Sequence, residues 1–236
     1  MPRSAGVCLM GVCEVGRGPT VLATLDASSL ACMVFGWDGS LRAFSDAAEW
    51  FVRTAALVGD RWDRPGLGEW DVRALVGHTS RSLVTVETYL ARPAAAAEMA
   101  SAADYFRATR AVAAGPAVAA RGRDAGAALG ADPAAAVAEI AARVRALVDS
   151  QDGSELVTTI AGGMRLADYL PTRTFELVVH TADLATALGV PPDVPATSAM
   201  QALHIITDLA VADGLAGPLL LAATGRPGLP DGFSVL

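Results

Sequence analysis

The sequence predicts an all-α protein: a bundle of four main helices with an additional C-terminal helix and short extended segments. Apolar residues recur at helical spacing in several windows, most clearly around Glu176 and His180. Much of the 53% hydrophobic content is alanine, which favours helices over strands. Capping residues precede the periodic windows, and Gly or Pro follows them. The 236 residues correspond to one ordinary domain with appendages.

The composition argues against several kinds of partner. The net charge is −7, so an acidic surface disfavours binding to nucleic acid or to anionic membranes. No apolar run reaches the roughly 18 residues of a membrane span. All eighteen basic residues are Arg, which suggests a GC-rich genome. We expect a cytoplasmic protein, monomeric or homodimeric, that acts on small molecules.

Residues 1–40 differ from the helical domain predicted for residues 41–236. They are rich in Gly and small residues and show no sustained periodicity. They also hold all three cysteines, Cys8, Cys13 and Cys32, and an odd number gives no disulfide framework. We expect a poorly ordered leader or an over-extended start of translation.

Two helices open the predicted domain. An apolar stripe predicts the first helix from about Leu41 to Val58. Asp71 is a good N-cap, and the apolar face after it predicts a second helix from Val72 to about Leu90. His78 lies beside the inner face of this second helix.

The middle of the chain is rich in Ala and Gly. A helical piece is expected over residues 104–113, and the composition of residues 114–130 indicates a flexible connection. Asp132 as N-cap and Pro133 at the first helical position then predict a third helix that ends near Val148.

A fourth helix follows a short extended piece. Residues 156–160 favour extended structure, which Gly162 and Gly163 interrupt. Residues 169–171 lead into the fourth helix, which begins near Arg173 and stops at Gly189.

A fifth helix completes the bundle. Ser198 and Gln201 have the spacing of a capping box at its start, and Gly214 ends it. The apolar residues 219–223 then form either a strand or a packed tail.

Three residues on two of these helices are candidate metal ligands. Glu176 and His180 are four residues apart, so their side chains lie on one helix face with Cβ atoms roughly 5–6 Å apart. That face is otherwise apolar, so the two groups must pair or share a cation. With His78 they supply two imidazoles and a carboxylate, a set typical of a catalytic divalent metal. The alternatives are a hydrogen-bonded core histidine and a simple intrahelical pair.

Other polar residues near this set have two interpretations each. Asp183 follows His180 by three residues, so it either orients the imidazole or is a solvated charge. Arg173 either holds an anionic substrate or pairs with Asp168. Arg173 and Asp183 are therefore our candidate catalytic residues. His204 and Asp208 on the fifth helix are expected to form a surface pair.

Three stretches of the chain carry a family resemblance. Residues 70–78 (WDVRALVGH) resemble the tryptophan-to-histidine motif of the mycothiol-dependent maleylpyruvate isomerase family. Residues 173–184 (RTFELVVHTADL) are similar to the second motif of that family, and residues 224–230 (TGRPGLP) to a closing segment. The resemblance covers roughly residues 41–236.

The resemblance implies both a fold and a chemistry. The family belongs to the DinB-like superfamily of metal-binding four-helix bundles. It implies that His78, Glu176 and His180 bind a divalent metal, zinc being the expected ion, and that the thiol of mycothiol occupies an open metal position. The chain would then be an isomerase or an S-transferase that acts on an electrophilic small molecule. No cysteine follows Cys32, so an external thiol would supply the nucleophile.

One departure from the family affects the expected substrate. Characterised isomerases of the family carry a further C-terminal domain that contributes to the substrate site, whereas this chain ends at Leu236. Thiol transfer to another electrophile is therefore at least as well supported as maleylpyruvate isomerisation. The alternative function is a non-catalytic bundle that a metal, or only a Glu176–His180 pair, stabilises.

Overall fold

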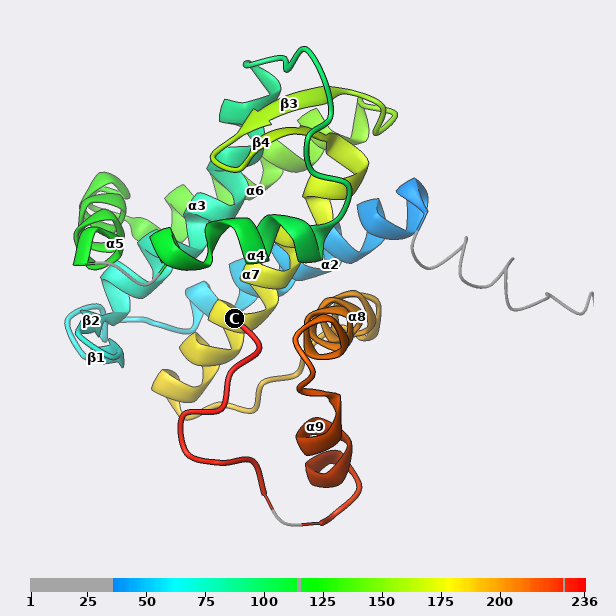
Figure 1. Cartoon of the computed structure of the whole chain (residues 1–236). Coiled ribbons are helices and arrows are strands. Elements are labelled where there is room, and N and C mark those ends of the chain that lie inside the picture. The colour runs from blue at the N-terminus through cyan, green and yellow to red at the C-terminus, as the bar shows by residue number, and fades with distance from the viewer. Residues whose placement is uncertain (1–35, 114–115, 227) are drawn as a thin grey trace, which may run out of the picture.

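The computed structural model describes residues 36–113, 116–226 and 228–236, and in these residues the protein is predominantly helical (Figure 1). The helices are α2 (Trp37–Ala56), α3 (Val72–Leu90), α4 (Ala102–Ala113), α5 (Pro116–Ala128), α6 (Pro133–Asp149), α7 (Leu166–Leu188), α8 (Ala196–Ala212) and α9 (Ala216–Ala223). The strands are β1 (Pro65–Leu67), β2 (Trp70–Asp71), β3 (Leu156–Thr159) and β4 (Gly162–Arg165). The all-α prediction is confirmed, while all three cysteines lie outside the described residues.

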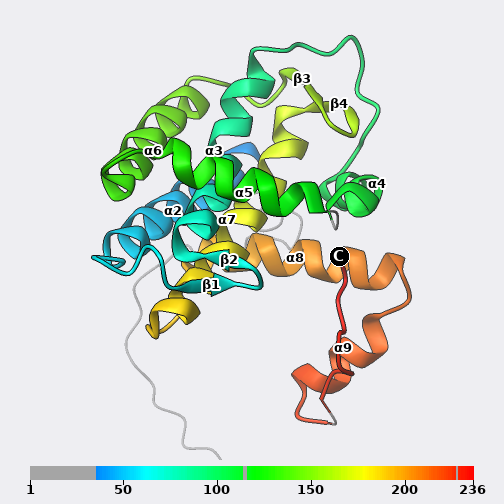
Figure 2. The ribbon, with the colours of Figure 1, turned by 90° about the vertical axis from the view of Figure 1, so that its left-hand side faces the viewer.

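Four helices form the central bundle. Both α2 and α3 pack against α6 and against α7. Their facing sides bury large apolar residues, among them Phe44, Phe51, Leu75, Leu83, Leu170, Leu177 and Leu184. The β1–β2 and β3–β4 hairpins lie at opposite ends of this bundle (Figures 1 and 2). None of the described helices combines the length and the apolar character needed to cross a bilayer.

The first described helix begins before its predicted start. Helix α2 starts at Trp37 rather than near Leu41, so residues 37–40 belong to a helix and not to an irregular segment. Ser40 is buried, and its hydroxyl accepts a hydrogen bond of 2.9 Å from the Gln201 side-chain amide. This contact joins two helices that lie far apart in sequence, which is why local periodicity did not show it.

Two predicted caps are confirmed. The Asp71 carboxylate accepts a hydrogen bond of 2.7 Å from the backbone N–H of Ala74, and α3 spans the predicted residues 72–90. The Asp132 carboxylate likewise accepts a hydrogen bond of 3.0 Å from Ala135 at the start of α6. Each carboxylate satisfies a backbone donor that the first helical turn leaves without a partner.

The flexible connection predicted for residues 114–130 is wrong. Helix α5 occupies most of this segment and packs along α3. An added Cβ at Gly77 of α3 would lie 2.1 Å from the backbone nitrogen of Gly126 in α5. Glycine at both positions thus lets the two backbones touch, a kind of packing that an apolar stripe cannot indicate.

The β2–α3 junction also fixes α5. The indole of Trp70 donates a hydrogen bond of 3.0 Å to the carbonyl of Ala119. A Cβ at Gly122 would lie 2.7 Å from the same indole, so only glycine fits against the ring there. Helix α5 is therefore held at two places along one side of α3.

Two more boundaries differ from the prediction. Gly162 and Gly163 do not interrupt the extended segment but lie in β4, which pairs antiparallel with β3. Helix α7 begins at Leu166, seven residues before the predicted start at Arg173, and includes Pro171. Pro171 lies in the second turn of α7, so the helix lacks the hydrogen bond that an N–H at this position would donate to the carbonyl of Ala167.

The capping box predicted at the fifth helix is wrong. Ser198 and Gln201 lie inside α8, which begins at Ala196, and both face α2. The Ser198 hydroxyl donates a hydrogen bond of 2.7 Å to the carbonyl of Ala43. These side chains therefore join two helices instead of capping one. The predicted strand or packed tail at residues 219–223 is part of helix α9.

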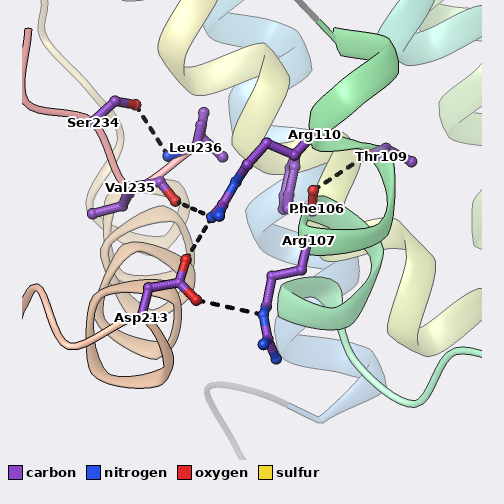
Figure 3. Close-up of polar contacts among 8 residues, drawn as sticks. All are labelled: Phe106, Arg107, Thr109, Arg110, Asp213, Ser234, Val235 and Leu236. Atoms are coloured by element: carbon purple, nitrogen blue, oxygen red, sulfur yellow. Dashed lines mark hydrogen bonds and ion pairs between the residues drawn. The ribbon is translucent and has the colours of Figure 1, made fainter.

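The C-terminal residues return to α4 (Figure 3). Arg110 of α4 donates to the Asp213 carboxylate at 2.6 Å and to the carbonyl of Val235 at 3.1 Å. Arg107 lies 3.5 Å from the other carboxylate oxygen of Asp213. The hydrogen bond from Arg110 holds the pKa of Asp213 below its usual value. Helix α4, the end of α8 and the last residues thus share one polar cluster.

The glycine contact between α3 and α5 yields a stability prediction. Gly77→Ala should lower the melting temperature by several degrees, because overpacking costs about 1–3 kcal/mol, and 1 kcal/mol corresponds to roughly 2–4 °C in a domain of this size. Gly217→Ala in α9 is the matched control, since no atom lies within 4 Å of its added Cβ. Equal melting temperatures for the two variants would contradict this packing.

Candidate metal centre

Helices α3 and α7 bring the three predicted ligands together. His78 projects from α3, and Glu176 and His180 project from α7, which packs against α3. One ligand atom from each residue lies within 4.8 Å of the other two. All three side chains are half-buried. The geometry therefore permits a single metal ion to contact all three.

The His180 imidazole is held at both ring nitrogens. Its Nε2 lies 3.2 Å from a carboxylate oxygen of Glu176, and its Nδ1 lies 3.1 Å from a carboxylate oxygen of Asp183. A carboxylate that accepts from one ring nitrogen fixes the orientation of the ring and leaves the other nitrogen for a metal. Asp183 is therefore placed to orient His180, which is one of the two roles considered from the sequence.

The His78 imidazole is positioned by ring contacts. Its ring centroid lies 4.4 Å from that of Trp70 and 4.7 Å from that of His180, the two imidazoles meeting edge to face. Its Nδ1 is buried and has no hydrogen-bond partner among the described residues. A buried nitrogen without a partner is costly, and coordination to a cation would satisfy it.

Burial and neighbouring charges shift the pKa values of His78, Glu176 and His180 in different directions. Burial, assisted by the nearby His180, lowers the pKa of His78 to about 4, so this imidazole is neutral at pH 7. Burial also opposes ionisation of Glu176, but the hydrogen bond from His180 and the charge of Arg173 outweigh it and lower the pKa of Glu176 to about 2.

His180 shows the opposite balance. Burial lowers its pKa, but the hydrogen bonds to Asp183 and Glu176 outweigh that effect and raise the pKa to about 9. A divalent ion that binds here would therefore displace a proton from His180, because a metal needs the neutral imidazole.

The donor set suits a catalytic ion better than a structural one. Structural zinc sites use four protein ligands, whereas catalytic sites use three and leave a position for water or substrate. Among the described residues, no fourth His, Cys, Asp or Glu joins the group formed by His78, Glu176 and His180. The residues present thus fit a divalent metal with at least one open position.

Arg173 does not pair with Asp168, so that alternative from the sequence is wrong. Asp168 instead accepts a hydrogen bond of 2.8 Å from Arg165. Arg173 is only 8% exposed, and its guanidinium carbon lies 5.0 Å from the ring centroid of Tyr169 and 5.4 Å from that of Tyr105. It lies one turn before Glu176 on α7, so it belongs to the wall of the candidate site.

The tyrosines around Arg173 were not identified from the sequence. Tyr169 precedes Arg173 by four residues, a spacing that could have indicated their contact. Tyr105 lies on α4, and no local pattern relates it to α7. By contrast, His204 and Asp208 form the expected half-exposed pair, 3.4 Å apart and outside the trio.

The cluster yields a prediction about metal content. The protein purified with zinc should retain about one divalent ion per chain, and His180→Ala should lose most of it, because two ligands do not hold a catalytic ion firmly. His204→Ala is the matched control, since His204 has a carboxylate at the same i, i+4 spacing but lies outside the cluster. Elemental analysis measures both, and a zinc-free wild-type protein would contradict the site.

A family model matches the part of the chain that contains the candidate site. The family model described as the mycothiol maleylpyruvate isomerase N-terminal domain matches residues 42–185, which include the three candidate metal ligands and Asp183. No curated protein and no solved structure matches the chain. The matched span covers most of the chain, and the all-α bundle is consistent with the DinB-like fold expected from the resemblance. The chain therefore belongs to the mycothiol maleylpyruvate isomerase N-terminal domain family.

Proposed function

We propose that this protein is a divalent-metal-dependent enzyme that uses mycothiol as an external thiol. The observation that carries the proposal is the group of three ligands, two imidazoles and one carboxylate, without a fourth protein ligand among the described residues. The family match supports mycothiol as the thiol. Zinc is the proposed ion, since it accepts this donor set and leaves a position for an exchangeable ligand.

Each residue of the site has a role in this proposal. His78, Glu176 and His180 would hold the ion, which when bound lowers the pKa of a thiol and favours the reactive thiolate. Asp183 accepts a hydrogen bond from Nδ1 of His180 and so keeps Nε2 directed towards Glu176. The Trp70 ring packs against the His78 ring in a tilted contact and restrains its orientation.

The proposed reaction is addition of the thiol to an electrophilic carbon. In transfer, a sulfur–carbon bond forms at an activated double bond and the thiol proton ends on the neighbouring carbon. In isomerisation, the added thiol leaves again after rotation about the former double bond, so the double bond and the free thiol are regenerated. None of the described residues is a cysteine, so the bundle itself supplies no competing thiol.

The substrate and the setting are also proposals. Helices α8 and α9 lie beyond the span matched by the family model, so the region next to the matched domain need not serve the family's named substrate. We therefore propose a small electrophile, either maleylpyruvate or another activated carbonyl compound. A monomer or homodimer in the reducing cytoplasm, where thiols persist, fits this chemistry.

Activity measurements with mycothiol test the proposal. Glu176→Gln should reduce both zinc content and thiol-dependent turnover at least about tenfold, because a change at the metal's coordination sphere costs that much or more. It should leave the helical circular dichroism spectrum unchanged, since glutamine keeps the volume and a hydrogen-bonding oxygen. Glu139→Gln, on the exposed surface of α6, is the matched control.

The three cysteines need a separate control. The triple variant Cys8→Ala, Cys13→Ala and Cys32→Ala should keep full mycothiol-dependent turnover. Loss of turnover at unchanged zinc content would place the reactive thiol in residues 1–35 and contradict the external-thiol mechanism. Zinc binding without turnover on any electrophile would favour the non-catalytic bundle.

A further inference from the structure

Arg173, beside the candidate metal ligands, forms no ion pair with any carboxylate in the described part of the chain. Arg173 is only 8% exposed, and it lies on the same face of α7 as Glu176, one turn earlier. Its Nε donates a hydrogen bond of 3.0 Å to the hydroxyl of Thr172. Among the described residues, no acceptor forms a hydrogen bond or ion pair with its two terminal nitrogens.

The terminal nitrogens of Arg173 are not completely sealed from solvent. The Nδ1 atom of His78 is fully buried and has no hydrogen-bond partner within the described residues, whereas the two terminal nitrogens of Arg173 are not fully buried. The rings of Tyr105 and Tyr169 pack against the guanidinium and stabilise its charge, but ring faces do not replace in-plane acceptors for the N–H groups. The four terminal N–H donors are thus available to a ligand.

The partners of other arginines show that this arrangement is unusual in the protein. Arg61 donates to the carbonyls of Val58, Leu57 and Leu188. Arg110 donates to Asp213 and to a backbone carbonyl. Both are more exposed than Arg173. The least exposed of these three guanidinium groups is therefore the one with the fewest acceptors.

The nearest carboxylate does not neutralise Arg173. Glu176 acts on it through its charge but lies beyond ion-pair distance, and its oxygen is engaged with Nε2 of His180. A buried charge without an ionic partner is costly, and a planar guanidinium fits a carboxylate through two parallel hydrogen bonds.

We propose that Arg173 is the anion subsite of the metal centre and binds a carboxylate of the electrophilic substrate. The inference rests on the proposed function, and it narrows the substrate class to electrophiles that carry a carboxylate near the reactive carbon. Tyr105 and Tyr169 hold the guanidinium in place, and the ligand completes its hydrogen bonds.

Matched electrophiles test the subsite by kinetics. With mycothiol as thiol, 4-oxopent-2-enoate is compared with its methyl ester, which keeps the reactive carbon but lacks the charge. Arg173→Met should lower kcat/KM for the acid about 10- to 100-fold, mainly through KM, because it removes a charge-assisted hydrogen-bond pair. The ester should change less than about threefold. Arg173→Lys should recover part of the loss, since lysine keeps the positive charge but cannot form the two parallel hydrogen bonds of a guanidinium.

Arg165→Met is the matched control for the kinetics. Arg165 precedes the first residue of α7 and pairs with Asp168, and it lies eleven residues before Glu176, about 16 Å along the helix. This variant should treat acid and ester as the wild type does. Equal losses for acid and ester in Arg173→Met, at unchanged zinc content and melting temperature, would overturn the subsite.

Binding of a non-reactive acid separates this inference from the proposed function. Calorimetric titration of the zinc-loaded protein with 4-oxopentanoate, without thiol, should show binding that weakens at least about tenfold in Arg173→Met. That result would support the subsite even if no electrophile were turned over, which would defeat only the proposed function. No binding to wild type, or equal binding to both proteins at equal zinc content, would overturn the subsite. If Arg173→Met does not fold, Arg173→Lys carries the same comparison.

Discussion

The packing of α3 against α7 is the contact on which the candidate site depends. It places His78 opposite Glu176 and His180, which share one face of α7. Neither helix alone supplies three ligands. Other elements keep this contact in register: α5 holds the start of α3 through Trp70, and α2 packs against α7 from another side. The site is therefore a property of the bundle rather than of a loop, which favours a precise ligand geometry.

The charges around α7 are arranged around the same contact. His180 lies between the carboxylates of Glu176 and Asp183, and Arg173 lies one turn before them. A divalent ion would displace the proton on His180, so the positive charge of the imidazolium would be replaced by that of the metal ion. Arg173 stays positive in both cases, and this charge is the basis of the proposed anion subsite.

Sequence patterns predicted the parts of the fold that local rules determine. Asp71 and Asp132 mark helix starts because a cap acts within one turn. Glu176 and His180 were paired because i, i+4 spacing fixes side-chain proximity, and His78 was added because it lies beside the inner face of its own helix. Helix α5 was missed because glycine contacts with α3, rather than an apolar stripe, hold it. Ser198 and Tyr105 were misread or missed because their partners lie on helices distant in sequence.

X-ray absorption at the zinc edge tests the central claim most directly, and the triple cysteine-to-alanine variant removes every protein thiol from the measurement. Before mycothiol is added, the account predicts only nitrogen and oxygen neighbours, at about 2.0–2.2 Å. Adding mycothiol should introduce one sulfur at about 2.3 Å. A zinc shell that gains no sulfur at mycothiol concentrations that saturate turnover would contradict activation of the thiol at the trio of His78, Glu176 and His180.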